Sequence, residues 1–183
     1  MDKNLVAIVI PLSNRPYLTE SEKISLNHLE YYLGHYDKYF IAPKGLEVSY
    51  NNYPVSRFDD KFFGSPTAHN RFLFSGELYK EFSDYKYVLI YHLDSLVFKN
   101  SLEKWCALDY DYIAPPWIVG PDLPWLKENG IGNGGFSLRK VEAFSKLLNS
   151  KVKWIQRDDI IPINSNASVT QTISRIAKNA IRY

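Results

Sequence analysis

A continuous apolar run near the amino terminus constrains the fold of this chain more than any other feature. Residues 4–10, NLVAIVI, are aliphatic after the first asparagine and rich in β-branched side chains, and Pro11 follows them directly. A strand that is apolar on both faces must be covered on both faces, which is typical of parallel sheets with helices on either side. We therefore predict an α/β protein with a mainly parallel central sheet flanked by helices.

The segments that follow alternate between helix and strand. Thr19 and Glu22 have the spacing of a capping box, which predicts a helix to about Leu33 that ends at Gly34. Residues 36–43, YDKYFIAP, form the next strand and complete a βαβ unit. A strand is predicted at 55–63, and after it a helix from Thr67 to about Phe82 that buries Phe74, Leu78 and Phe82. A buried strand from Tyr85, a helix at 101–108 capped by Ser101 and a strand at 109–117 come next. The last predicted elements are a strand from Phe136, a helix through Leu148 and a helix at about 173–180.

Length and charge narrow the classes of protein to which this chain can belong. Its 183 residues predict a single domain, residues 1–183, and a hydrophobic content of 45% excludes intrinsic disorder. The 22 Lys and Arg residues are interspersed with 20 Asp and Glu residues, so no basic face predicts a nucleic-acid partner. No run reaches the roughly 20 apolar residues of a transmembrane segment, and the lone Cys106 cannot form an internal disulfide. We therefore expect a cytoplasmic protein.

Asp94 is the first candidate for a functional residue. It follows the buried run YVLIY, at what should be the carboxyl end of a strand, where open α/β sheets place ligand crevices. If this carboxylate is buried, it needs a cation, a hydrogen-bond donor or water beside it. Mg²⁺ and Mn²⁺ commonly take one or two protein carboxylates and complete their shell with phosphate and water. Asp94 is thus a candidate metal ligand, and a side chain that caps the following turn is the alternative.

A glycine-rich loop is the second candidate. Five of the nine glycines lie between Gly120 and Gly135, and the sequence GIGNGGF matches neither the Walker phosphate loop nor the dinucleotide fingerprint. Gly134 and Gly135 would let a ligand approach the backbone closely, with Asn133 offering a donor and an acceptor. A tight turn without a ligand explains the same pattern.

Other polar and aromatic side chains have two readings each. His92 is either a donor to an anionic ligand or a satisfied strand histidine. Asn70 and Arg71, which we expect to open a helix, could face phosphate or belong to a solvated helix surface. Trp117 flanks the glycine-rich loop, where it could stack on a sugar or base, or pack in the protein.

Several segments together resemble an uncharacterised family of glycosyltransferase-like proteins with the GT-A fold. The similarity runs from about residue 4 to residue 150, and its most specific motifs are YHLDSLVF at 91–98 and GNGGFSLR at 132–139. In such transferases an Asp-x-Asp pattern at a strand end holds the divalent cation, Mn²⁺ or Mg²⁺, that bridges the diphosphate of a nucleotide sugar. Here His92 stands at the first acidic position, so the resemblance implies that Asp94 alone serves as metal ligand and catalytic residue.

The resemblance also implies which residues bind the substrates. Those expected to contact the nucleotide sugar are Pro11, Ser13, Arg15, Asn70, Arg71, His92, Asp94 and Ser95. Those expected to lie against the donor sugar and the acceptor are Trp117, Asn133, Gly134 and Gly135.

The implied function is metal-dependent transfer of a sugar from a nucleotide-diphosphate donor to a hydroxyl group of a carbohydrate or glycolipid acceptor. Surface polysaccharide or glycolipid synthesis is the implied process, with the protein in the cytoplasm or peripheral at the membrane. Similar proteins continue into an acidic segment that is a source of the catalytic base. We expect this chain to be shortened there, with Asp158 and Asp159 as the nearby acids. The alternative is a catalytically inactive module that binds a nucleotide sugar or a partner.

Overall fold

The first part of the chain folds into a parallel βαβ unit. The structure is a computed structural model that describes residues 4–12, 15, 17–48, 53–121, 130 and 133–150. β1 (Val6–Pro11) pairs in parallel with β2 (Asp37–Pro43), and α1 (Glu20–Leu33) connects them. α1 begins at the predicted capping box of Thr19 and Glu22. The sequence therefore located this unit correctly.

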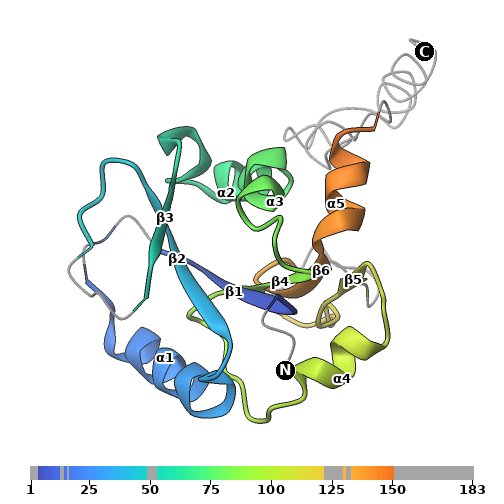
Figure 1. Ribbon diagram of the computed structural model, residues 1–183. Helices are drawn as coiled ribbons and strands as arrows, with labels where there is room; N and C mark the ends of the chain where they lie inside the picture. Colours follow the sequence, from blue (N-terminus) through green and yellow to red (C-terminus); the bar gives the residue numbers. More distant parts are fainter. Residues whose placement is uncertain are drawn as a thin grey trace. The chain divides into compact units, whose positions relative to one another are not determined.

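Six strands form one sheet in the order β3-β2-β1-β4-β6-β5 (Figure 1). β3 (Val55–Phe58) is parallel to β2, and β4 (Tyr87–Tyr91) is parallel to β1 on its other side. β6 (Phe136–Lys140) is antiparallel to β4, and the short β5 (Tyr112–Ile113) is antiparallel to β6. The predicted α/β class with a mostly parallel sheet is confirmed.

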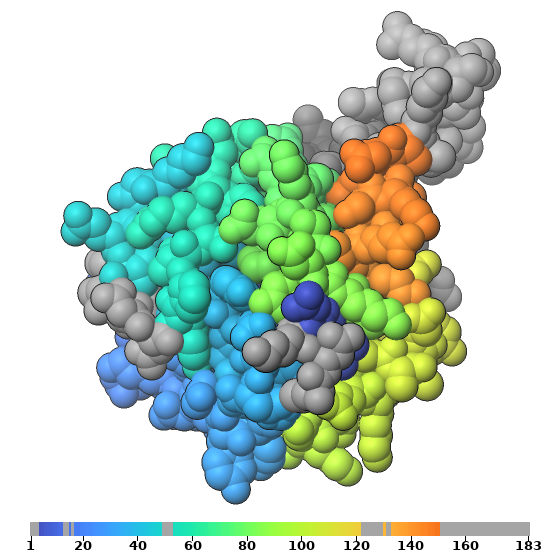
Figure 2. Space-filling view, viewed as in Figure 1, coloured from blue at the N-terminus to red at the C-terminus, as the bar shows by residue number. Residues whose placement is uncertain are grey.

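Helices cover both faces of this sheet, which explains the apolar strands. α1 and α4 (Leu102–Ala107) pack on one face, and α2 (Pro66–Leu73), α3 (Gly76–Glu81) and α5 (Val141–Leu148) pack on the other (Figure 1). Successive residues of β1 and β4 point to opposite faces and enter two separate cores. α3 and α5 lie against each other, green beside orange in Figure 2. No described helix has the length and apolar character needed to span a bilayer.

The predicted helix at 67–82 is wrong, because the chain forms two helices there. α2 ends at Leu73, and the Ser75 hydroxyl accepts a hydrogen bond from the backbone N–H of Leu78 and so starts α3. Phe74 lies at the break and is 43% exposed, whereas Leu78 and Phe82 are buried as predicted. A serine N-cap stops a helix that apolar spacing alone would continue.

Two strands and one helix cap also differ from the prediction. The strand predicted at 55–63 ends at Phe58, because the Asp59 side chain accepts from the N–H of Lys61 and starts a turn of 3₁₀ helix. The strand predicted at 109–117 pairs only at Tyr112–Ile113, and the Ser101 side chain makes no capping hydrogen bond to α4. The helix predicted at 173–180 lies outside the described residues. The chain divides into two units, Met1–Asn149 and Ser150–Tyr183, and all the elements above lie in the first.

Candidate functional site

The strand order reverses between β1 and β4, and this reversal locates the candidate site. After β1 the chain adds β2 and β3 on one side, then returns to place β4 on the other side of β1. Open α/β sheets bind ligands at the carboxyl ends of the strands where such a reversal occurs. Val9 of β1 lies beside Ile90 of β4, so Pro11 and Tyr91 end the two strands at one edge. We call Pro11, residues 92–95 and residues 133–135 the switch-point site.

Asp94 lies in a tight turn directly after β4. The N–H of Ser95 donates to the carbonyl of His92 at 3.0 Å and closes the turn. The Asp94 side chain is exposed, with the Ser95 hydroxyl 3.5 Å from its Oδ1. Water can therefore solvate this carboxylate without a compensating cation. The carboxylate is accessible to an external ligand.

Buried hydrogen bonds fix this turn to α1. The Ser25 hydroxyl, on a side chain that is 1% exposed, donates to the carbonyl of Ser95 at 2.6 Å. The Tyr91 hydroxyl donates to the same carbonyl at 2.9 Å, and burial raises its pKa, so it stays protonated. Further along, Nδ1 of His28 lies 3.2 Å from the carbonyl of Val97. The backbone beside Asp94 is thus held in place before any ligand arrives.

His92 pairs with a histidine of α2. Nε2 of His92 lies 2.8 Å from Nε2 of His69, so one imidazole donates and the other accepts. Burial lowers the pKa of His69 to about 4, helped by His92 and by the charge of Arg139. Burial also lowers the pKa of His92, with Asp94 opposing the shift and Arg139 adding to it. Both imidazoles are therefore neutral near neutral pH.

Gly135 leaves room for the His92 ring. The N–H of His92 donates to the carbonyl of Gly135 at 2.8 Å, and a Cβ atom on Gly135 would lie 2.8 Å from Nδ1 of His92. The side-chain oxygen of Asn133 accepts from the N–H of Gly135, and the Tyr112 hydroxyl donates to the carbonyl of Asn133. Glycine is needed here for packing, and close approach of a ligand to this loop stays a prediction.

The structure brings together some of the predicted site residues and separates others. His92, Asp94, Ser95 and residues 133–135 lie in one group by direct contact or chain adjacency, and strand register places Pro11 next to them. Asn70 and Arg71 do not open a helix but lie on the exposed side of α2, while His69 faces β4.

Arg15 and Trp117 have partners of their own. Arg15 forms an ion pair of 2.9 Å with Glu22, whose other carboxylate oxygen accepts from the N–H of Thr19, so Arg15 lies beside the start of α1. Trp117 is bridged to Gly130 by two backbone hydrogen bonds. Ser13 lies outside the described residues, as do the expected acids Asp158 and Asp159.

Two residues of this region were missed by the sequence analysis. His69 was not among the predicted site residues, and Arg139 appeared only as the last residue of the motif GNGGFSLR. Ser137 and Arg139 alternate on β6 opposite Ile90 and Val88, so both point into a core, and each is 1% exposed. The sequence signal that could have revealed Arg139 is the presence of two polar residues at strand positions whose side chains point into the core.

The site fits a metal ion only when a ligand shares in binding it. Among the described residues no group of three or more His, Cys, Asp or Glu side chains is placed to hold a metal. Asp94 offers one exposed carboxylate, and the His92 ring is engaged by His69. Mg²⁺ and Mn²⁺ are often bound by one or two carboxylates together with substrate phosphates and water. Asp94 therefore fits a cation that arrives with a phosphorylated ligand.

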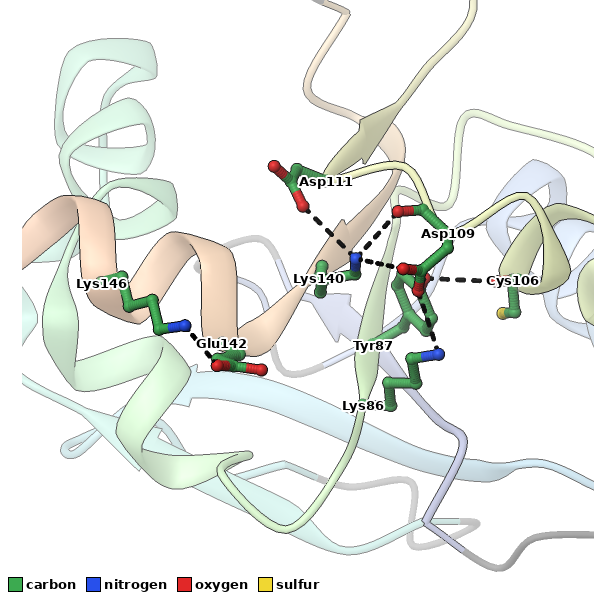
Figure 3. A network of polar contacts seen from close by, with 8 residues as sticks. All are labelled: Lys86, Tyr87, Cys106, Asp109, Asp111, Lys140, Glu142 and Lys146. Carbon is green, nitrogen blue, oxygen red and sulfur yellow. Dashed lines mark hydrogen bonds and ion pairs between the residues drawn. The ribbon is translucent and has the colours of Figure 1, made fainter.

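A cluster of charges at the opposite edge of the sheet is structural (Figure 3). Asp109, in a left-handed conformation with φ of 56°, accepts from Lys140 and Lys86 at 3.0 Å each. Hydrogen bonds from Lys140, Lys86 and Tyr87 lower its pKa to about 2. Burial raises the pKa of the nearby Cys106 thiol to about 11, so the thiol is protonated at neutral pH. The cluster fixes the α4–β5 connection to the amino end of β4.

Two hollows in the described part also lie away from the switch-point site. One, of about 540 Å³, is next to the ends of β2 and β3 at Lys44 and Asp59, and the other, of about 270 Å³, includes Asn4 and Asp84. Neither is lined by a residue of the switch-point site. The candidate site is therefore defined by its polar groups and by its place at the reversal point of the sheet.

Comparison with known protein families identifies a match. Residues 52–178 match the family described as proteins of unknown function, DUF5672. No curated protein matches the chain. The matched range contains β3 to β6, the Asp94 turn and the loop at 133–135.

Proposed function

We propose a function for this chain, which belongs to the DUF5672 family of proteins of unknown function, from the geometry of its switch-point site. The protein is a glycosyltransferase of GT-A fold that moves a sugar from a nucleotide-diphosphate donor to a hydroxyl group of a carbohydrate or glycolipid. The observation that carries the proposal is the exposed Asp94 carboxylate, held in a fixed turn at the carboxyl end of β4, where the strand order reverses.

The surrounding chain supports this assignment. A mostly parallel sheet with one antiparallel strand next to β4 agrees with the GT-A fold that the motifs YHLDSLVF and GNGGFSLR imply. Both motifs meet at the site, because the N–H of His92 donates to the carbonyl of Gly135. Segments about 40 residues apart in sequence thus form one surface, as a shared ligand would require.

The main requirement of the reaction is to stabilise the negative charge of the departing diphosphate. In sugar transfer the acceptor oxygen bonds to the anomeric carbon and its proton passes to solvent water. The bond from that carbon to the diphosphate breaks, and negative charge builds on the leaving group. A divalent cation bound with the donor would stabilise that charge. Asp94 would hold the cation, and Ser25 and Tyr91 keep the backbone of its turn in place. Little reorganisation is then needed during the reaction.

The neutral histidine pair contributes orientation and not charge. Since His69 and His92 bond to each other through Nε2, the His92 ring is fixed over Gly135. The loop at 133–135 lies next to this ring and would contact the donor sugar and the acceptor. We place the reaction on the cytoplasmic side of the membrane, in assembly of surface polysaccharide or glycolipid.

Release of nucleoside diphosphate from a panel of nucleotide sugars, with Mn²⁺ and sugar acceptors, tests the proposal. Wild-type protein should release diphosphate from one donor, and Asp94→Asn should reduce that rate by about 100-fold or more. Asp84→Asn is the matched control, because Asp84 is also exposed but lies before β4, at the opposite edge of the sheet. Equal rates for Asp94→Asn and Asp84→Asn would refute the proposed role. Donor binding without turnover would identify the non-catalytic binding module.

A further inference from the structure

Arg139 is a buried cation without an acidic partner in the described part. Its side chain is 1% exposed, and its guanidinium donates from Nε to the Ser137 hydroxyl at 3.0 Å. Nη1 donates to the carbonyl of Leu73 at 2.9 Å and to the Tyr79 hydroxyl at 3.0 Å. All three acceptors are neutral. The ion pairs among the described residues do not include Arg139.

The surroundings of Arg139 tolerate this charge but do not neutralise it. The rings of Phe74, Tyr112 and Phe144 lie 5.3–5.6 Å from its Cζ atom, a cation–π arrangement. The other buried cation of the described part, Lys38, has a carboxylate oxygen of Glu30 at 3.5 Å. Burial of an unpaired charge is costly, so its retention here calls for a further partner.

The charge lies beneath the switch-point site. A methyl group on Gly134 would come within 3.4 Å of Nη2 of Arg139, and Nη2 forms no hydrogen bond with a described residue. The guanidinium is also close enough to His69 and His92 to depress both of their pKa values. Its field therefore reaches the corner where Gly134 and Gly135 meet His92.

We infer that Arg139 is an electrostatic anchor for the phosphate groups of the ligand, attracting a diphosphate to the switch-point site from beneath Gly134 without touching it. The inference rests on the proposed function, since it takes a nucleoside diphosphate as the ligand. A charge held below the surface is screened less than a solvated lysine and acts over a longer range. Arg139 thus supplies a fixed positive charge to a site in which Asp94 is the one exposed carboxylate proposed to bind a cation.

Ser137 offers a way to neutralise this charge without removing the guanidinium. Ser137 is 1% exposed, and its hydroxyl accepts from Nε of Arg139 and donates to the carbonyl of Gly134. Ser137→Asp would place a carboxylate against Nε, and Ser137→Asn introduces a side chain of the same size without charge. A difference in ligand affinity between the two variants therefore reports the effect of the added negative charge, because both variants have the same packing cost.

The test is calorimetric titration of wild type, Ser137→Asp and Ser137→Asn with nucleoside mono- and diphosphates and inorganic pyrophosphate. Ser137→Asp should bind the diphosphate and pyrophosphate at least tenfold more weakly than Ser137→Asn, because even one ligand charge at about 10 Å in an effective dielectric of about 20 accounts for that factor. Ser137→Asp should also prefer diphosphate over monophosphate less strongly than Ser137→Asn does. A purely structural role of Arg139 would not change this preference.

The outcomes separate this inference from the proposed function. Equal diphosphate affinity in folded Ser137→Asp and Ser137→Asn overturns the anchor and leaves the proposed function standing. Wild type that binds pyrophosphate but no nucleoside diphosphate supports the anchor and overturns the proposed function, whereas wild type that binds none of these ligands overturns both. If a thermal melt shows that Ser137→Asp does not fold, the anchor is tested instead by measuring pyrophosphate binding to wild type in EDTA. Binding without metal supports the anchor, and binding only with Mn²⁺ overturns it.

Discussion

Acid should destabilise this protein through His69, because the folded state resists its protonation. Burial, His92 and Arg139 lower the pKa of this imidazole from 6.5 to about 4. In the unfolded chain the imidazole titrates near its ordinary value, so between these two pH values the unfolded state binds more protons. The free energy of unfolding is therefore highest above about pH 7 and falls as the pH drops toward 4.

The pKa difference sets the size of the effect. A shift from 6.5 to about 4 corresponds to about 3 kcal/mol when the titration is complete. At about pH 5 the unfolded imidazole is almost fully protonated and the folded one hardly at all, so about 2 kcal/mol of stability is lost. This is a large share of the 5–15 kcal/mol typical of a domain.

Urea denaturation followed by tryptophan fluorescence, at about pH 7.5 and pH 5, measures this loss. His69→Gln keeps a side chain that can bond to His92 but does not titrate, so its loss should be about 2 kcal/mol smaller than that of wild type. His35→Gln is the control, because it replaces an exposed histidine outside the switch-point site. The same loss in wild type and His69→Gln would refute the reasoning.

Three further predictions concern packing. Gly135→Ala should lower the free energy of unfolding by about 1–3 kcal/mol, because its Cβ would lie 2.8 Å from Nδ1 of His92; an unchanged urea midpoint would show that the ring moves freely. Ser25→Ala should cost about 1 kcal/mol through the lost bond to the Ser95 carbonyl, and a neutral result would mean that this bond does not hold the turn. Cys106, with its pKa near 11, should react with a thiol reagent only as the protein unfolds, so rapid labelling in native buffer would contradict its burial.

The parts of this fold that were predictable have local signals. The runs at 4–10 and 87–91 are apolar on both faces, and the spacing of Thr19 and Glu22 marks a helix start without reference to the rest of the chain. The break at Ser75 was missed because the apolar spacing of Phe74 and Leu78 continues through it. A serine followed by glycine and glutamate is a helix-start signal that could have revealed the break.

The chemistry of the site was less accessible, because it depends on tertiary contacts. Asp94 and the glycine-rich loop could be found from strand ends and composition, but the pairing of His69 with His92 joins residues 23 positions apart. The burial of Arg139 depends on aromatic side chains from distant parts of the chain: Phe74 between α2 and α3, Tyr112 of β5 and Phe144 of α5. No local pattern encodes such contacts, and the alternation of polar residues on β6 gave only a hint.

The central claim is that Asp94 holds a divalent cation together with a nucleoside diphosphate at the reversal point of the sheet. Calorimetric titration with nucleoside diphosphates, with and without Mn²⁺, tests it most directly. For one nucleoside diphosphate, Mn²⁺ should raise the affinity of wild type and Asp84→Asn by about tenfold or more and should leave the affinity of Asp94→Asn unchanged. An equal gain with Mn²⁺ in Asp94→Asn, or no binding of any nucleoside diphosphate by wild type, would contradict it.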